Sequence, residues 1–88
     1  MAWTAKYSDT ALRQLSKLDR QLALRILNYV DSRVIGAESP RQLGKALTGP
    51  MGGLWRYRVG DYRVICDIQD DVLVVLVVTV GNRGDVYR

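Results

Sequence analysis

The sequence contains no histidine, which excludes several common kinds of active site. Histidine is the usual general base and metal ligand near neutral pH, and it completes the Ser/His and Cys/His nucleophilic dyads. The single cysteine, Cys66, leaves no possibility of an internal disulfide. Because it falls on the apolar face of a predicted strand, we interpret it as a buried core thiol. Any chemistry of this chain must come from other side chains.

We also expect neither a targeting segment nor a membrane-spanning one. The N-terminus has no apolar h-region, so we expect no signal peptide. The apolar run at 72–80 is too short to cross a bilayer as a helix. We therefore expect a cytoplasmic protein without a membrane partner. With 88 residues, 48% hydrophobic and 25% charged, residues 1–88 predict a single soluble domain with a small core.

The charge of the chain is positive and unevenly distributed. The formal net charge is +4 and the isoelectric point is about 9.6. Residues 1–49 carry the whole excess, whereas residues 50–88 are neutral overall. In this second half the arginines gather on predicted strands and most aspartates fall at likely turns. One face of the sheet is therefore expected to be strongly positive, which suits a polyanion or an acidic protein partner.

Residues 55–68 predict a β-hairpin around Gly60-Asp61, a two-residue turn signal with glycine where a positive φ is needed. The register that follows pairs Arg58 with Arg63 and Trp55 with Cys66. Side chains alternate between the two faces of a strand. One face then carries Trp55, Tyr57, Val59, Tyr62, Val64 and Cys66, and the other carries Arg56, Arg58, Arg63 and Ile65.

Two arginines directly opposite each other destabilise a sheet, because like charges on a cross-strand pair repel. Their presence suggests a negatively charged ligand. Guanidinium groups are permanent cations whose forked donors match phosphate, so Arg56, Arg58 and Arg63, with Arg83 within reach, could clamp one. Tyr87 could add a stacking platform for a base. The residues alone leave open a solvated face whose arginines pair with the aspartates at 61, 67 or 85.

The remaining segments predict an α+β domain in the order β-α-α-β-β-β. A short strand at 2–7 precedes two helices, which begin near Ser8 and Asp19 as capping residues and form a helical hairpin packed on the Trp55 face of a small, mainly antiparallel sheet. The second helix is expected to end near Ile35-Gly36. A helical turn at 42–47 and a loop at 48–53 then lead into the hairpin. The apolar run at 72–80 is typical of a central strand.

Several segments together resemble the RelE/ParE superfamily of bacterial toxins, and more closely its RelE branch of mRNA interferases. They are Lys45–Gly49, Gly53–Arg58, Gly60–Ile65, the apolar strand at 72–80, and Val80–Arg83 followed by Val86–Tyr87. The order of elements is similar as well, so the resemblance covers nearly the whole chain.

The resemblance implies a ribosome-dependent endoribonuclease that cleaves mRNA in the A site without a metal or a cofactor. A ribose 2′-hydroxyl would attack the adjacent phosphate, leaving a 2′,3′-cyclic phosphate and a 5′-hydroxyl. By position, Arg56 and Arg58 stand where the family has basic residues, often lysines. Arg63 matches the arginine that stabilises the phosphate, Arg83 the one that protonates or stabilises the leaving oxygen, and Tyr87 the tyrosine that orients the substrate.

Two departures from the family pattern affect this site. Arg56 and Arg58 replace lysines, and an arginine hardly ever loses its proton, so the general base is unidentified. Catalysis would then depend on positioning and on electrostatic stabilisation of the transition state. Thr48 stands where some members have another arginine. Lys45 completes the predicted set of RNA-binding residues.

The same resemblance implies partners and leaves two alternatives. The expected partners are a RelB-like antitoxin, the ribosome and mRNA. One alternative is a ParE-like toxin that inhibits DNA gyrase and need not retain the full set of arginines and Tyr87. The other is a non-catalytic module that binds RNA or protein on the same fold, and binds RNA with a steep salt dependence without cutting it.

Overall fold

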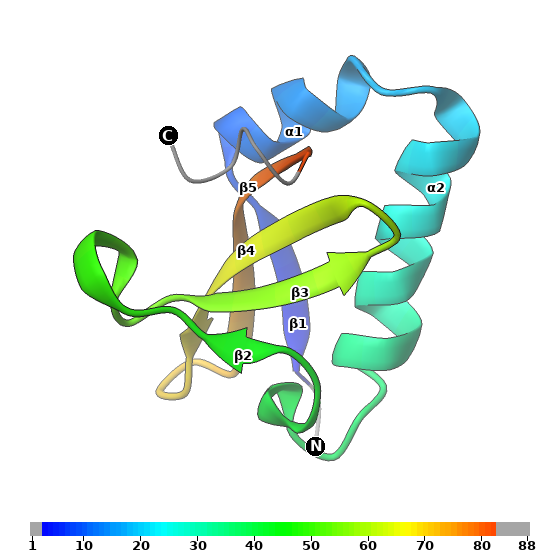
Figure 1. Ribbon diagram of the computed structural model, residues 1–88. Helices are drawn as coiled ribbons and strands as arrows, with labels where there is room; N and C mark the ends of the chain where they lie inside the picture. The colour runs from blue at the N-terminus through cyan, green and yellow to red at the C-terminus, as the bar shows by residue number, and fades with distance from the viewer. Residues whose placement is uncertain (1–2, 83–88) are drawn as a thin grey trace.

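Two helices and five strands make up the part of the chain that this computed structural model describes, residues 3–82 (Figure 1). They follow the order β1 (Thr4–Tyr7), α1 (Asp9–Ser16), α2 (Arg20–Tyr29), β2 (Lys45–Ala46), β3 (Trp55–Val59), β4 (Tyr62–Gln69) and β5 (Val74–Asn82). A π-helical turn at Val30–Val34 extends α2, and 3-10 turns at Pro40–Gln42 and Gly49–Met51 flank β2. The predicted order of elements is confirmed, with the two-residue strand β2 added to it.

The strands form one mixed sheet in the order β1-β5-β4-β3-β2. β1 runs parallel to β5, and the other neighbouring pairs are antiparallel. β5 thus has a strand on each side, as its continuous apolar sequence predicted. It begins at Val74 rather than at Val72, because Leu73 adopts a positive φ of 54° in the turn before it.

Side-chain caps fix the start of both helices at the predicted residues. The Ser8 hydroxyl accepts a hydrogen bond from the Ala11 amide at 3.0 Å, and the Asp19 carboxylate accepts one from the Leu22 amide at 3.4 Å. Such caps satisfy amide groups that have no partner inside the helix. From the short turn that joins them the two helices diverge, so that α1 crosses one end of the sheet and α2 runs along its side (Figure 1).

The hydrophobic core lies between the helices and one face of the sheet. Its buried members are Ala11, Leu15, Ile26, Val30, Val34, Tyr57, Val59, Val64, Cys66, Val75, Val77 and Val80. Trp55 and Tyr62 are half-buried and pack against this cluster. The two helices therefore pack on the face that was predicted to hold them. Cys66 is fully buried, and burial, with a smaller contribution from the Asp67 charge, raises the pKa of its thiol to about 12.

Helix α1 contacts β5 at a β-bulge. Ile65 pairs with Thr79 and Cys66 with Val77, which leaves Val78 as the extra residue. Helix α1 satisfies polar groups at this irregularity: the Ser8 hydroxyl donates to the Val78 carbonyl at 2.7 Å, and the amide nitrogen of the Gln14 side chain donates to the Thr79 hydroxyl at 2.8 Å.

The β3–β4 hairpin has the predicted register. Trp55 pairs with Cys66, Arg58 pairs with Arg63, and Gly60 in the turn has a φ of +60°. The helical turn expected at 42–47 is wrong. The chain makes its 3-10 turn earlier, at Pro40–Gln42, and then becomes extended as β2, because Lys45 and Ala46 pair with β3.

Candidate functional site

Two pairs of like charges face each other across neighbouring strands of the sheet. Lys45 on β2 pairs with Arg56 on β3, and Arg58 on β3 pairs with Arg63 on β4. Each arrangement is unfavourable in the free protein, because charged side chains opposite each other lie within about 5.5 Å at Cβ. Four cations therefore follow one another across β2, β3 and β4 on neighbouring positions of the sheet.

The face that carries these arginines is less open than the sequence suggested. Arg58 is exposed and Arg56 half-buried, but Arg63 is only 4% exposed and Ile65 is fully buried. β4 lies between β3 and β5, whereas β2 pairs only with Trp55 and Arg56 and leaves Arg58 at a free edge.

The arginines do not pair with the aspartates that were their alternative partners within the described residues. Neither Asp61 nor Asp67 forms an ion pair with Arg56, Arg58 or Arg63 in residues 3–82, and the ion pair found there joins Arg41 to Asp70. Asp85, the third aspartate considered, lies outside the described residues. Across 3–82 the charge on this face is therefore unneutralised.

A shallow groove of about 200 Å³ lies between α2 and the β2–β3 edge of the sheet. It is lined by Tyr29, Leu43, Gly44, Lys45, Arg56 and Arg58. None of its side chains is an acid, and three are cations. A larger depression of about 290 Å³ is lined by Leu47, Thr48, Pro50 and Met51, which offer no charge to a ligand.

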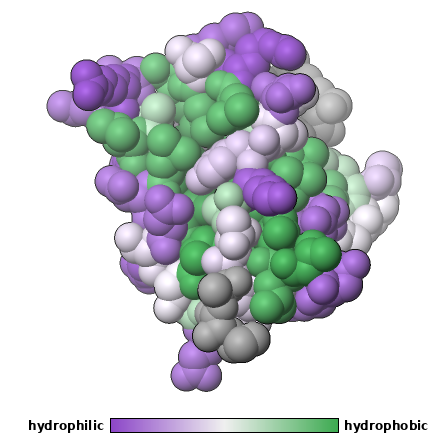
Figure 2. Space-filling view, turned by 180° about the vertical axis from the view of Figure 1, so that it is seen from behind, coloured by the Kyte–Doolittle hydropathy of each residue, from purple (hydrophilic) through white to green (hydrophobic). Residues whose placement is uncertain are grey.

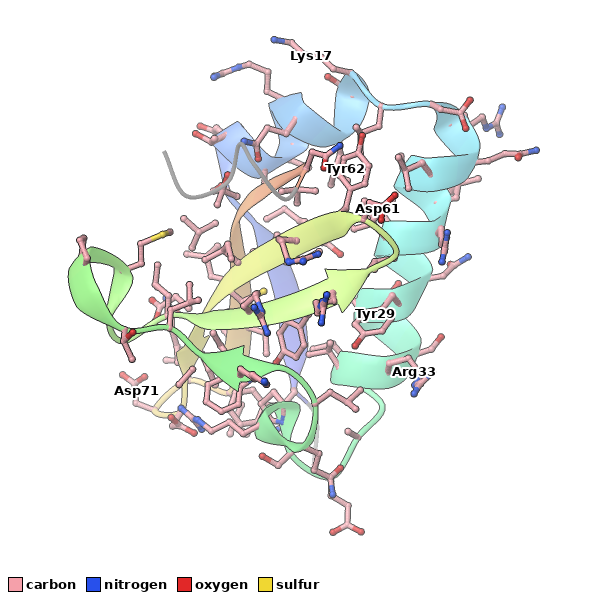
Figure 3. All side chains as sticks on the ribbon, in the orientation of Figure 1. Lys17, Tyr29, Arg33, Asp61, Tyr62 and Asp71 are labelled. Atoms are coloured by element: carbon pink, nitrogen blue, oxygen red, sulfur yellow. The ribbon has the colours of Figure 1, made fainter. Side chains whose placement is uncertain are left out.

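Tyr29 is a member of this groove that the sequence did not identify. Figure 3 shows its hydroxyl directed from α2 toward the end of β3. The ring contacts Tyr57 edge-on, with centroids 6.3 Å apart, and the Arg33 guanidinium lies 6.0 Å from its centroid. Burial raises the pKa of the Tyr29 phenol, and Arg33 lowers it to a smaller extent. A signal existed in its spacing, three residues after the core residue Ile26.

Aromatic side chains of β3 hold the loop that presents Lys45. The Trp55 indole Nε1 donates to the Leu43 carbonyl at 2.7 Å, and the buried Tyr57 hydroxyl donates to the Pro40 carbonyl. Between these anchors and β2, Gly44 has a φ of +78°, and a Cβ there would collide with the Arg56 carbonyl oxygen. The close approach of the loop to β3 therefore requires glycine.

One polar atom of the groove is buried without a partner. Within the described residues, Nε of Arg56 forms no hydrogen bond, although it is inaccessible to solvent. The predicted site residues Lys45, Arg56, Arg58 and Arg63 thus lie on neighbouring positions of three strands. Two further predicted residues, Arg83 and Tyr87, lie outside the described residues.

Neither a metal-binding cluster nor a membrane-spanning helix is found in the described part of the chain. No group of three or more Cys, Asp or Glu side chains in residues 3–82 is arranged to hold a metal ion. In the same range no helix combines the length and apolar character needed to cross a membrane. The side of the molecule seen in Figure 2 carries apolar areas interleaved with polar side chains.

Comparison with known proteins identifies the family. A family model described as the ParE toxin of type II toxin-antitoxin systems matches residues 5–87. Toxin RelE of Mycobacterium tuberculosis is 33% identical over 79 residues, covering 90% of this chain and 79% of that protein. The chain belongs to the RelE/ParE toxin superfamily.

Other relatives of this superfamily agree. Toxin RelG of Mycobacterium tuberculosis is 28% identical over 88 residues, which is 100% of this chain and 99% of that protein. A chain in the crystal structure of the toxin-antitoxin complex RelBE2 from the same organism superposes with a TM-score of 0.85 at 26% identity, covering 97% of this chain and 95% of that one. The protein is thus a toxin of the type II toxin-antitoxin class with a RelE-like fold.

Proposed function

We propose that this toxin is a ribosome-dependent endoribonuclease that cleaves mRNA in the ribosomal A site and so inhibits translation. The observation that carries the proposal is the pair formed by Arg58 and Arg63, two guanidinium groups opposite each other with no carboxylate partner in residues 3–82. Arg63 is buried, and a buried cation without a partner is costly, so a phosphate bound between the two arginines would offset that cost. The curated relatives RelE and RelG point to the same branch.

In the proposed reaction the ribose 2′-hydroxyl attacks the adjacent phosphorus, and the bond to the 5′-oxygen of the next nucleotide breaks. The products are a 2′,3′-cyclic phosphate and a 5′-hydroxyl, so the step needs neither a metal nor water. Arg58 and Arg63 would stabilise the extra negative charge that develops on the phosphate oxygens, and Arg56 would support the same charge. Arg83 would stabilise the charge on the leaving oxygen, and Tyr87 would orient the substrate.

The proposed site would act through its positive charge, because it contains no identified general base. Arg56 and Arg58 are poor bases because a guanidinium keeps its proton in water and in protein. The rate enhancement would therefore come from holding the 2′-hydroxyl, the phosphorus and the leaving oxygen in line, and from fixed cations around the phosphate. We expect a slower toxin than one with lysines at the same two positions.

The proposed partners follow from this reaction. The substrate is mRNA bound to the ribosome, which places the toxin in the cytoplasm. The chain in the RelBE2 complex comes from an assembly of toxin and antitoxin. We extend this to the present chain and propose a RelB-like antitoxin whose acidic or extended segment covers the basic face.

Mapping of mRNA 5′ ends after induction in cells tests the proposed function. We expect new 5′-hydroxyl ends inside translated codons and none in untranslated regions. Arg63→Ala and Arg83→Ala should each abolish these ends and relieve growth arrest while the proteins remain folded. Cleavage that ignores reading frames, or full toxicity of both variants, would refute the assignment.

A ParE-like activity is the second candidate, because the family model that matches residues 5–87 is named after ParE. This alternative predicts inhibition of DNA gyrase, and therefore a DNA damage response with intact mRNA. A non-catalytic RNA-binding module predicts neither response, only RNA binding that weakens steeply with salt. The same induction experiment, read for DNA damage and for mRNA ends together, distinguishes the three.

A further inference from the structure

The groove beside α2 offers a second position for an anion, next to the proposed cleavage site. Arg58 lines this groove and also faces Arg63 across the hairpin, whereas Arg63 itself does not line it. Arg58 is therefore shared between two positive regions. One contains Arg63 on β4, and the other contains Tyr29, Lys45 and Arg56 on the side of α2.

The chemistry of the groove fits a group with several oxygen acceptors and a negative charge. Its polar side chains are one ammonium, two guanidiniums and one phenol, and none of them is an acid. Nε of Arg56 is buried there with no hydrogen bond in residues 3–82. Gly44 has no side chain, so the ligand meets open backbone on that wall.

We propose that this groove binds the phosphate group adjacent to the one that is cleaved, so that two consecutive phosphates of the mRNA strand lie on either side of Arg58. This inference rests on the function proposed above; it adds Tyr29 as a substrate-binding residue and assigns Lys45, already predicted to bind RNA, to the second phosphate. The Tyr29 hydroxyl donates a hydrogen bond to this second phosphate, and Lys45 supplies a charge from β2. Neither side chain touches the bond that breaks.

The position of Tyr29 supports the role of a donor. Its hydroxyl is directed toward the end of β3, where Arg58 lies (Figure 3). Contact with Tyr57 and the proximity of Arg33 hold the ring in place. Burial raises the pKa of the phenol, which keeps it protonated and able to donate at neutral pH.

The experiment measures single-turnover cleavage on ribosomes programmed with a defined codon in the A site. Three mRNAs are compared: an unmodified one, and two in which the linkage on one or the other side of the cleaved bond is a neutral methylphosphonate. On the unmodified mRNA, Tyr29→Phe and Lys45→Ala should each raise the toxin concentration for half-maximal rate by about tenfold, with the maximal rate little changed.

Matched variants control for the loss of a hydroxyl or a charge elsewhere. Tyr62→Phe removes a phenol hydroxyl on the core side of the hairpin, the face opposite Arg58, and Lys17→Ala removes an exposed cation at the end of α1 (Figure 3). Both should behave as wild type on all three mRNAs. Thermal unfolding of each variant, expected within a few degrees of wild type, excludes a general loss of structure.

Combining the protein variants with the modified mRNAs tests the proposal. With one of the two methylphosphonate mRNAs, the wild type should itself need about ten times more toxin for half-maximal rate. On that mRNA, Tyr29→Phe and Lys45→Ala should raise the required concentration no further. The groove does not bind that phosphate if both variants raise the half-maximal concentration by the same factor on all three mRNAs. The same conclusion follows if neither variant changes it on any mRNA. If the wild type cuts no programmed mRNA at all, the proposed function fails instead.

Discussion

Arg63 is the residue in which stability and function are most clearly opposed. It is 4% exposed, on a strand enclosed by two others, and it faces another arginine. No carboxylate is paired with it in residues 3–82. Removing a cation from water without a partner is unfavourable, so a protein selected only for stability would place an apolar side chain here.

Replacing Arg63 with methionine tests this opposition. The apolar chain of Arg63→Met fills much of the same space without the charge, and we expect the free energy of unfolding to rise by about 1 kcal/mol while cleavage of mRNA is lost. Urea unfolding and mapping of mRNA ends measure the two effects. The exposed Arg58→Met should change stability by less than about 0.5 kcal/mol. A less stable Arg63→Met protein would contradict the cost assigned to the buried charge.

Trp55 supports the site through packing rather than through contact with substrate. It packs against the core and donates from Nε1 to the Leu43 carbonyl. Trp55→Ala should lower the free energy of unfolding by roughly 3–5 kcal/mol, whereas Trp55→Phe, which keeps a ring and loses the donor, should cost only about 1–2 kcal/mol. Chemical denaturation compares them. Equal losses in the two variants would mean that the hydrogen bond, not the packing, is what Trp55 provides.

At the scale of elements, the β3–β4 hairpin could be predicted and its surroundings could not. The Gly60-Asp61 turn and the alternation of side chains determine the register locally, so the pairing of Arg58 with Arg63 followed from the sequence. Arg63 pairs with Gly81 of β5, a strand distant in the sequence, and β2 exists only because it pairs with β3. The helical spacing from Ile26 places Tyr29 on the inner side of α2, but its position beside Arg58 depends on how α2 packs on the sheet.

The loop between α2 and β3 is the element that most depends on one glycine. Gly44 has a φ of +78°, and a Cβ there would meet the Arg56 carbonyl oxygen and the Trp55 indole. Gly44→Ala should therefore destabilise the protein by about 3 kcal/mol or more, and it should displace Lys45 from Arg56.

Gly49 provides the matched control for Gly44. Its φ of +70° is similar, but no atom lies within 4 Å of a Cβ built there. Gly49→Ala should show only the backbone cost of a left-handed residue, about 1–2 kcal/mol. Thermal and urea unfolding of both variants measure the difference. Equal destabilisation would indicate that the loop can move away from β3 and that the steric contact is not what fixes it.

The molecule as a whole has a net positive charge, and its interior contains two tyrosine phenols and a cysteine thiol that are uncharged at neutral pH. Burial, with smaller contributions from nearby groups, raises the pKa of the Tyr7 phenol from 10.0 to about 12 and also raises that of Tyr57. The Cys66 thiol rises from 9.0 to about 12 for the same main reason. These groups hold their protons more tightly in the folded protein than in the unfolded chain, so folding is linked to pH in the alkaline range.

The expected pH dependence follows from the sign of these shifts. Since the chain has no histidine, the free energy of unfolding should be nearly constant between about pH 6 and 8. Above about pH 9 the unfolded chain loses the Cys66 proton while the folded protein keeps it, so stability should fall as the pH rises toward 12. The thiol alone accounts for roughly 4 kcal/mol at most.

Urea unfolding of the wild type and of Cys66→Ala across this range measures the contribution of the thiol. The variant is less stable at neutral pH because it loses a buried sulfur, but its decline should begin about one pH unit higher, where the tyrosines of the unfolded chain begin to ionise. The two curves should therefore converge as the pH rises. Parallel curves would show that the Cys66 thiol does not contribute to the alkaline loss of stability, and would assign that loss to Tyr7 and Tyr57.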